Sequence, residues 1–422
     1  MKILAITAFA AMYVLMTLFS KKRVWFVLAT AVLFLCAGII PLSHIPSTIN
    51  WNVLMMMTGT MVLVYYFIES KMPNLIADTL LDLSPNVMWV TIFMSLFSGL
   101  ISAFIDNVAT VLMVAPVGLA ICKKLKISPV PMVLAIAVSS NLQGAATLVG
   151  DTTSIMLGAY AKMDFTDFFW MNGRPGIFFA VELGALMTVP VMLFLFRKDK
   201  QSVQADQKTK VTDYAPTFLL IAMVAALIIA SFNKDKPEIT NGLICCIAAL
   251  TAVLLGLLKS SGTTHAIGAL KSIDFETLLL LTGLFVVIEG ITEVGLIDDI
   301  ATVLGGVGGN NIFLLYTIIV WGSVLASAFI DNIPYVATML PVIRGICSAN
   351  NLPPMLLFFG LLIGATLGGN LTPIGASANI TAAGLLKKNG YPSGFKDFAK
   401  IGIPFTLVAV ISGYLFTWIV WS

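Results

Sequence analysis

Long apolar segments separated by short loops dominate this chain. Eight of them have the length of one membrane span, because about 20 apolar residues cross the roughly 30 Å of hydrocarbon in a bilayer. These segments lie near residues 3–19, 24–42, 50–69, 176–197, 215–232, 241–258, 275–294 and 402–421. Only 11% of the residues are charged, against about 25% in soluble domains. We therefore predict an all-α integral membrane protein.

Four further apolar segments are too long for one straight crossing: 89–122, 129–160, 313–347 and 354–386. Each is interrupted by polar residues near its middle. Two are interrupted by Asp-Asn pairs, and their halves of about 15 residues would reach only roughly 22 Å. We predict re-entrant hairpins there, with tips near 106 and 331. The other two are predicted to be broken helices, unwound near 144–154 and 369–379, which a membrane tolerates only inside protein or beside a wet cavity.

The two hairpins belong to an internal repeat. Residues 102–117 read SAFIDNVATVLMVAPV and residues 327–342 read SAFIDNIPYVATMLPV, with 9 of 16 positions identical. The same spacing relates three residues of each broken helix: Gly144, Thr147 and Gly150 in the first, and Gly369, Thr372 and Gly375 in the second. We therefore predict a first repeat at 1–197 and a second at 215–422, joined by a cytoplasmic linker at 198–214.

The number of crossings determines how the repeats are related. Each repeat would hold five crossings and one hairpin, about ten transmembrane helices in all, so the second repeat must lie inverted relative to the first. With both termini outside the cell's inner (plasma) membrane, most Lys and Arg residues fall in inner loops, as the positive-inside rule requires. Inverted repeats with interrupted helices are typical of secondary transporters, whose sites lie at the repeat interface.

Asp106 and Asp331 are the main candidates for function, because a carboxylate deep in a bilayer is costly and is retained for a reason. Asn107 and Asn332 add amide groups beside them. Oxygen ligands suit Na⁺, and a desolvated aspartate suits a proton carrier. We expect Na⁺ or H⁺ as the coupling ion and no other cofactor. A structural hydrogen bond at each hairpin tip is the alternative.

The helix breaks supply the rest of the predicted site. Glycines would end the helices and let a ligand approach the backbone, and the helices that follow would aim free N–H groups inward. Close helix packing would explain these glycines equally well. The polar candidates for binding substrate or ion at the breaks are Thr147, Asp151, Asn370, Thr372, Ser377 and Asn379. Asp151 faces Ala376 in the repeat alignment, so we predict an asymmetric proton site there.

Charge and composition limit the cargo and the partners. No Lys or Arg falls at predicted mid-membrane depth, so a multivalent anion would lack a counter-ion, and we expect a neutral or cationic cargo. The two histidines and five cysteines form no metal-ligand spacing, so no metal site is expected beyond one for Na⁺. A basic face with interleaved aromatics is absent from the sequence, which argues against nucleic acid. The expected partners are the lipid bilayer and a small inorganic ion or metalloid.

These motifs resemble the ion transporter superfamily, which contains arsenite permeases, P-protein permeases, NhaD-type sodium/proton antiporters and divalent anion/sodium symporters with a citrate-transporter-like domain. The resemblance rests on SAFIDN at both tips, ATLVGD in the first repeat and GGNLTPIGASANITAAG in the second, and extends over nearly the whole chain. Symporters of the family carry Ser-Asn-Thr at the tips, so the Asp-Asn pairs favour the permease and antiporter branches. The resemblance implies a fixed scaffold and a moving hairpin-bearing domain, often in a homodimer.

We therefore predict a secondary active transporter, foremost a proton-coupled efflux permease of arsenite-permease type. A sodium/proton antiporter and a sodium-coupled anion (carboxylate) transporter are the alternatives. An intramembrane aspartyl hydrolase would also need two buried carboxylates, but it has no use for the repeat, so we do not expect an enzyme. The sequence contains no Walker-type loop, so ATP would enter only through an ATPase partner subunit.

Overall fold

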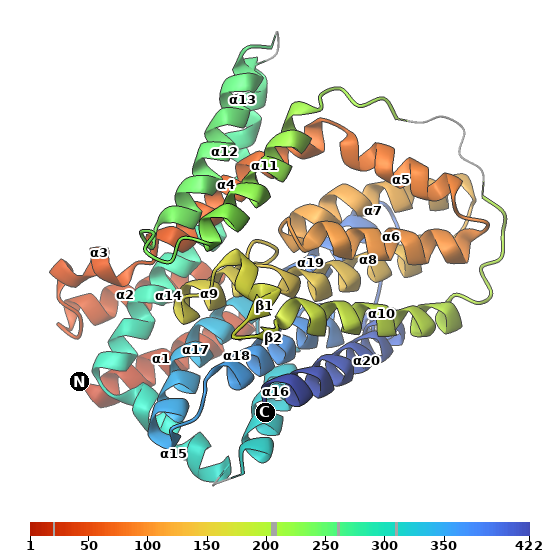
Figure 1. The fold of residues 1–422 in the computed structure, drawn as a ribbon. Helices are drawn as coiled ribbons and strands as arrows, with labels where there is room; N and C mark the ends of the chain where they lie inside the picture. Colours follow the sequence, from red (N-terminus) through yellow and green to blue (C-terminus); the bar gives the residue numbers. More distant parts are fainter. Residues whose placement is uncertain (20–21, 204–208, 260–261, 309–310) are drawn as a thin grey trace.

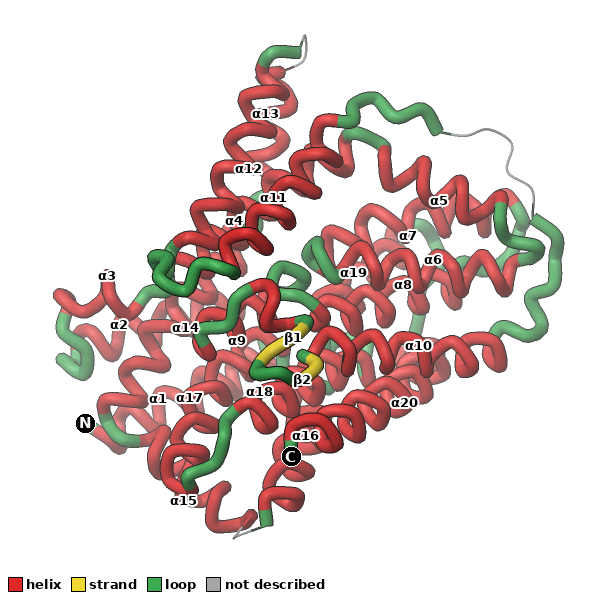
Figure 2. The backbone as a smooth tube through the Cα atoms, viewed as in Figure 1, coloured by secondary structure: helices red, strands yellow, loops and turns green. Residues whose placement is uncertain are grey.

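The computed structural model describes residues 1–19, 22–203, 209–259, 262–308 and 311–422, which form a bundle of helices (Figure 1). The strands within this part of the chain are β1 (Trp170–Met171) and β2 (Arg174–Pro175), which pair antiparallel (Figure 2). Six of the described helices are long and apolar enough to cross a membrane: α4 (Trp51–Glu69), α7 (Asn107–Lys124), α10 (Ile177–Leu195), α12 (Thr240–Leu257), α14 (Phe275–Glu293) and α20 (Phe395–Trp421). The predicted all-α membrane class is confirmed.

The remaining elements are shorter or less apolar. Those before the linker are α1 (Lys2–Leu18), α2 (Arg23–Cys36), η2 (Leu42–His44), α3 (Ile45–Thr48), α5 (Met72–Asp82), α6 (Val87–Ser102), α8 (Val130–Gln143), η3 (Gly144–Ala146), α9 (Thr152–Ala161) and η4 (Phe165–Phe168). Those after it are α11 (Ala215–Ser231), α13 (Gly262–Lys271), α15 (Leu296–Gly308), α16 (Ile312–Ser327), α17 (Asn332–Asn350), α18 (Met355–Leu362), η5 (Ile363–Leu367), η6 (Gly369–Leu371) and α19 (Ser377–Lys388).

The helices end where the polar interruptions predict. The first Asp-Asn pair separates α6 from α7, and the second separates α16 from α17. The chain leaves the α-helical path between α8 and α9, and again between α18 and α19, where only short turns (η3, η5 and η6) occur. The two halves of the chain therefore share one order of elements, whereas the inversion of one half relative to the other stays a prediction.

Four of the described α-helices were not predicted: α3, α5, α13 and α15. Helices α5 and α15 follow α4 and α14 at matching positions, and each has one apolar face. Pro73, Ala77 and Leu81 are buried in α5, while Asp298 and Asp299 of α15 are exposed. These helices are too short and too polar for a search for membrane spans to detect.

The helices pack in two groups. Helix α4 lies along α12 and α2 lies along α14, while α6 packs on α8 and α10 on α20 (Figure 1). Glycine allows the closest approaches within the first group. A Cβ atom on Gly59 of α4 would lie 2.5 Å from the backbone carbon of Cys245 in α12. A Cβ on Gly283 of α14 would lie 2.8 Å from Cγ1 of Val27 in α2.

Polar contacts join loops that are distant in the sequence. Residues 204–208 of the predicted linker lie outside the described residues, but Thr209 N donates a 2.7 Å hydrogen bond to Asp78 Oδ2, and Lys259 pairs with Asp213. On another face, Lys2 pairs with Asp299 at 2.6 Å. Which face lies inside the cell stays a prediction, as does the position of both termini outside.

We predict that Gly59→Ala lowers the free energy of unfolding by roughly 1–3 kcal/mol, because the added methyl group overlaps the backbone of α12. Gly384→Ala is the matched control, since a Cβ there would meet nothing within 4 Å. It should be neutral or slightly stabilising, because alanine favours the helix by about 1 kcal/mol. Unfolding of the purified variants in detergent measures both. Equal stability of the two variants would contradict the close contact of α4 with α12.

Candidate functional site

Asp106 and Asp331 are the N-cap residues of α7 and α17. Asp106 Oδ2 accepts hydrogen bonds from the backbone N of Val108 at 2.9 Å and of Ala109 at 3.2 Å. Asp331 Oδ1 accepts one from Ile333 N at 3.0 Å. An aspartate at this position satisfies N–H groups that a helix start leaves free and interacts favourably with the helix dipole. Each carboxylate keeps its second oxygen for other partners.

Thr147 and Thr372 attach each helix break to the hairpin tip beside it. The Thr147 hydroxyl donates to the backbone carbonyl of Ala103, and the Thr372 hydroxyl donates to that of Ala328. Both threonines are buried. The sequence proposed these hydroxyls as ligands, but in this structure the backbone uses them.

Gly150 and Gly375 lie where the break meets the tip. A Cβ on Gly150 would lie 2.6 Å from the carbonyl oxygen of Gly144 and 2.7 Å from that of Ala103. A Cβ on Gly375 would lie 2.5 Å from the carbonyl oxygen of Gly369. No other residue fits these positions without moving the backbone. Of the four predicted glycines, Gly150 and Gly375 therefore allow the close approach that forms the site.

A chain of asparagine side chains crosses from the first half to the second. Asn107 Nδ2 donates to Asn141 Oδ1 at 3.0 Å, and Asn141 Nδ2 donates to Asn370 Oδ1 at 3.1 Å. Asn379 Nδ2 donates to the same Asn370 oxygen at 3.2 Å. Asn141, Asn370 and Asn379 are fully buried. The sequence predicted three of the four; Asn141 was missed, although an asparagine inside an apolar segment signals a buried contact.

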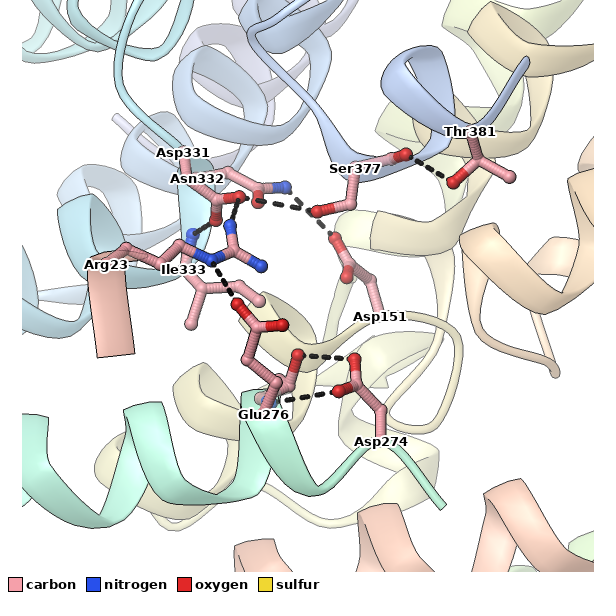
Figure 3. Close-up of polar contacts among 10 residues, drawn as sticks. Arg23, Asp151, Asp274, Glu276, Asp331, Asn332, Ile333, Ser377 and Thr381 are labelled. Carbon is pink, nitrogen blue, oxygen red and sulfur yellow. Dashed lines mark hydrogen bonds and ion pairs between the residues drawn. The ribbon is translucent and has the colours of Figure 1, made fainter. Parts of the chain in front are cut away.

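Asp151 lies at the boundary between the halves (Figure 3). It is 4% exposed, and its Oδ2 accepts from Thr153 Oγ1 at 2.9 Å and from Asn332 Nδ2 at 3.4 Å. Its counterpart Ala376 caps α19 without a side-chain hydrogen bond. The first break therefore contributes a carboxylate, and the second break does not.

One cavity of about 360 Å³ brings the tips and breaks together. It is lined by these predicted residues: Asp106, Asn107, Asp151, Asn332 and Ser377. Its volume is in the range of small-molecule sites. Lys271 and Asp274 also line it, so the cavity extends to the turn between α13 and α14. The other predicted site residues do not line this cavity: Thr147, Asp331, Asn370, Thr372 and Asn379.

The expectation that no basic side chain reaches the carboxylates is wrong. Arg23, the first residue of α2, forms an ion pair with Asp331 Oδ2 (Figure 3). Ser377 Oγ donates to the same oxygen at 3.3 Å, and Glu276 Oε1 lies 3.9 Å from Arg23 Nε. Arg23 stands at the end of its span in the sequence, but its long side chain reaches inward to the tip.

The two tips therefore differ in charge, although their sequences match. The Arg23 and Asp331 side chains are only 18% and 13% exposed. Asp106 forms no ion pair within the described part of the chain.

We predict that Asn370→Ala lowers the free energy of unfolding by roughly 1–3 kcal/mol, because it removes buried hydrogen bonds. The Asn370 side chain accepts from Asn141 and Asn379 and donates to the backbone carbonyl of Val138. Asn350→Ala is the control, since Asn350 is exposed and bonds only its own helix, at 2.9 Å to Ile346 O. A double-mutant cycle of Asn141 and Asn370 should give a coupling energy of about 0.5–3 kcal/mol. Additive effects would mean that the two side chains do not interact.

Comparison with known proteins agrees with this architecture. The fold is similar to the YdaH transporter of Alcanivorax borkumensis, with a TM-score of 0.60, 12% identity, and 89% of this chain and 87% of that chain covered. It is also similar to MtrF of Neisseria gonorrhoeae, from a class of antimetabolite efflux pumps, with a TM-score of 0.59, 13% identity, and 89% and 83% covered. At these identities the similarity shows a shared fold.

Sequence relatives give the family. An uncharacterized transporter of Mycobacterium tuberculosis is 30% identical over 436 residues, which cover 99% of this chain and 98% of the relative. The P protein of Mus musculus is 27% identical over 449 residues, covering 88% of this chain and 54% of its own length. The family described as "Citrate transporter" matches residues 11–356. The chain is a membrane transporter and not an enzyme, and it belongs to the citrate transporter family within the ion transporter superfamily.

Proposed function

We propose that this protein is a proton-coupled secondary transporter that exports a small neutral metalloid hydroxide of the arsenite type, with Asp106 and Asp151 as the exchangeable cation site. One observation carries the proposal: a carboxylate from a hairpin tip and a carboxylate from a helix break line the same cavity. Neither forms an ion pair within the described residues.

Two carboxylates that share a site of low polarity repel each other, and one of them favours taking up a proton or a cation. Asn107 and Asn332 line the same cavity and offer neutral oxygen atoms beside the carboxylates. Such a site binds a proton or Na⁺ reversibly. Reversible binding is the property that coupled transport requires.

The charge of the lining favours a neutral or cationic cargo. Three aspartates, Asp106, Asp151 and Asp274, line the cavity together with Lys271. An uncharged hydroxide such as arsenous acid avoids repulsion by this lining. Its hydroxyl groups match the amide and hydroxyl groups of Asn332 and Ser377, which reach the same space. A sodium/proton antiporter would use the same two carboxylates, with Na⁺ as the cargo.

Carboxylate transport is the second candidate, and Arg23 is the observation that favours it. A guanidinium at the second tip can bind a carboxylate in two-point geometry. An anionic substrate would have to displace Asp331 from Arg23. The description of the family as citrate transporters points the same way.

The proposal includes an alternating mechanism, in which the cavity opens to one side of the membrane at a time. The cavity extends to the α13–α14 turn. Away from that turn, ion pairs join the α11–α12 loop to the residues that end α9: Lys236 with Asp164 at 2.5 Å and Lys162 with Glu238 at 2.9 Å. In the proposed cycle these contacts separate when the site opens to the other side. The moving hairpin domain, the homodimer, the inner membrane and an ATPase partner all remain predictions.

Everted membrane vesicles test the proposal. We expect arsenite to dissipate an imposed proton gradient, and Asp106→Asn or Asp151→Asn to reduce the rate by about tenfold or more, because an amide does not exchange a proton. Asp298→Asn is the control, since this aspartate of α15 is exposed. Dissipation by Na⁺ or Li⁺ but not by arsenite would establish an antiporter instead. If arsenite, Na⁺ and Li⁺ all leave the proton gradient unchanged and the vesicles transport a carboxylate, the protein is a carboxylate transporter.

A further inference from the structure

We propose that Arg23 is a built-in cation at the second hairpin tip, so that in this conformation only the first tip takes up an exchangeable cation. The inference rests on the proposed cation coupling and extends it by making the two tips unequal. It assigns to Arg23 a positioning role that the repeat does not predict.

By sequence and local geometry the two tips are equivalent. Both read SAFIDN, and both aspartates cap the helix that follows. Both tips accept a threonine hydroxyl from the neighbouring break. These shared features predict a pair of equal cation sites.

The two tips differ in the surroundings of the carboxylate oxygen that does not cap the helix. At the second tip, the Oδ2 atom of Asp331 contacts the guanidinium of Arg23 and accepts a 3.3 Å hydrogen bond from Ser377. At the first tip, Asp106 has no such cation within the described residues. Gly59 of α4 meets Cys245 of α12, and its counterpart Gly283 of α14 meets Val27 of α2. This match places Asn241 of α12 at the position of Arg23, and asparagine has no charge to offer.

The charges around Asp331 explain why Arg23 excludes a second cation. Arg23 comes from α2 and Glu276 from α14, 3.9 Å from the Arg23 Nε atom. Asp151 of the first break approaches through Asn332, which donates to it at 3.4 Å. A cation placed beside Asp331 would lie against the guanidinium, and like charges at contact distance repel strongly at low polarity.

The ion pair between Arg23 and Asp331 joins two separate parts of the fold, so cation binding at Asp331 depends on how these parts are placed. Helix α2 packs along α14, whereas Asp331 lies in the α16–α17 hairpin. The ion pair therefore bridges α2 and the hairpin. An external cation reaches Asp331 only when the hairpin and α2 separate.

Proton uptake by the purified protein in lipid nanodiscs tests the inference without any cargo. The number of protons bound per chain is measured between about pH 8 and about pH 5, where partly desolvated carboxyls titrate. Asp106→Asn should lower the uptake, and Asp331→Asn should leave it as in the unmodified protein. Arg23→Gln should gain one proton, and Asp331→Asn in the Arg23→Gln background should remove that gain.

Two control variants separate charge from structure. Arg23→Lys keeps the cation and should bind no extra proton, and Lys22→Gln removes an exposed neighbouring charge and should have no effect. The inference is overturned if Asp331→Asn lowers uptake as much as Asp106→Asn does, or if the gain in Arg23→Gln survives Asp331→Asn. If Arg23→Gln does not fold, the comparison of Asp106→Asn with Asp331→Asn decides alone. The unmodified protein could carry no arsenite, sodium or carboxylate while Asp106→Asn and Asp331→Asn still differ in proton uptake. That result would refute the proposed function and leave this inference intact.

Discussion

In each half of the molecule, a threonine hydroxyl and a glycine hold a broken helix against the tip of a hairpin. Backbone groups inside a membrane protein must be satisfied by the protein itself, and an interrupted helix leaves several of them free. Thr147 and Thr372 use their hydroxyls for this purpose, and Gly150 and Gly375 allow the contact by having no side chain. The positions of the tip and break residues that line the cavity depend on this contact.

Residues that the two halves share build the framework, and residues that they do not share make the two sides of the site unequal. The N-cap aspartates, the threonines and the glycines occur twice. Asp151, Asn141 and Arg23 occur once, and they place a carboxylate, an amide and a cation in unequal positions around one cavity. The shared residues therefore give the two halves similar contacts between tip and break, while the unshared side chains make the binding groups of the two halves different.

The sequence predicted the parts of this structure that depend on local pattern. The length of an apolar segment and the place of its polar interruption were enough to find where the helices end at the tips and the breaks. Helices α7 and α17, with 18 and 19 residues, are longer than the predicted halves of the hairpins. Helices α5 and α15 were missed because a short amphipathic helix carries no membrane-span signal. Arg23 was missed because its partner Asp331 is distant along the chain, and no local pattern indicates which loop residue will reach inward. Thr147 and Thr372 were found for their polarity, but only the structure shows that they bond the backbone.

The central claim is that Asp106 and Asp151 exchange a proton at the boundary between the halves. Infrared difference spectroscopy on the purified protein during a pH step measures this directly, because a protonated buried carboxyl has its own band, apart from that of a carboxylate. The account predicts a band that appears at low pH and is lost or displaced in both Asp106→Asn and Asp151→Asn. A band that both variants retain unchanged, or the absence of any such band in the unmodified protein, would contradict it.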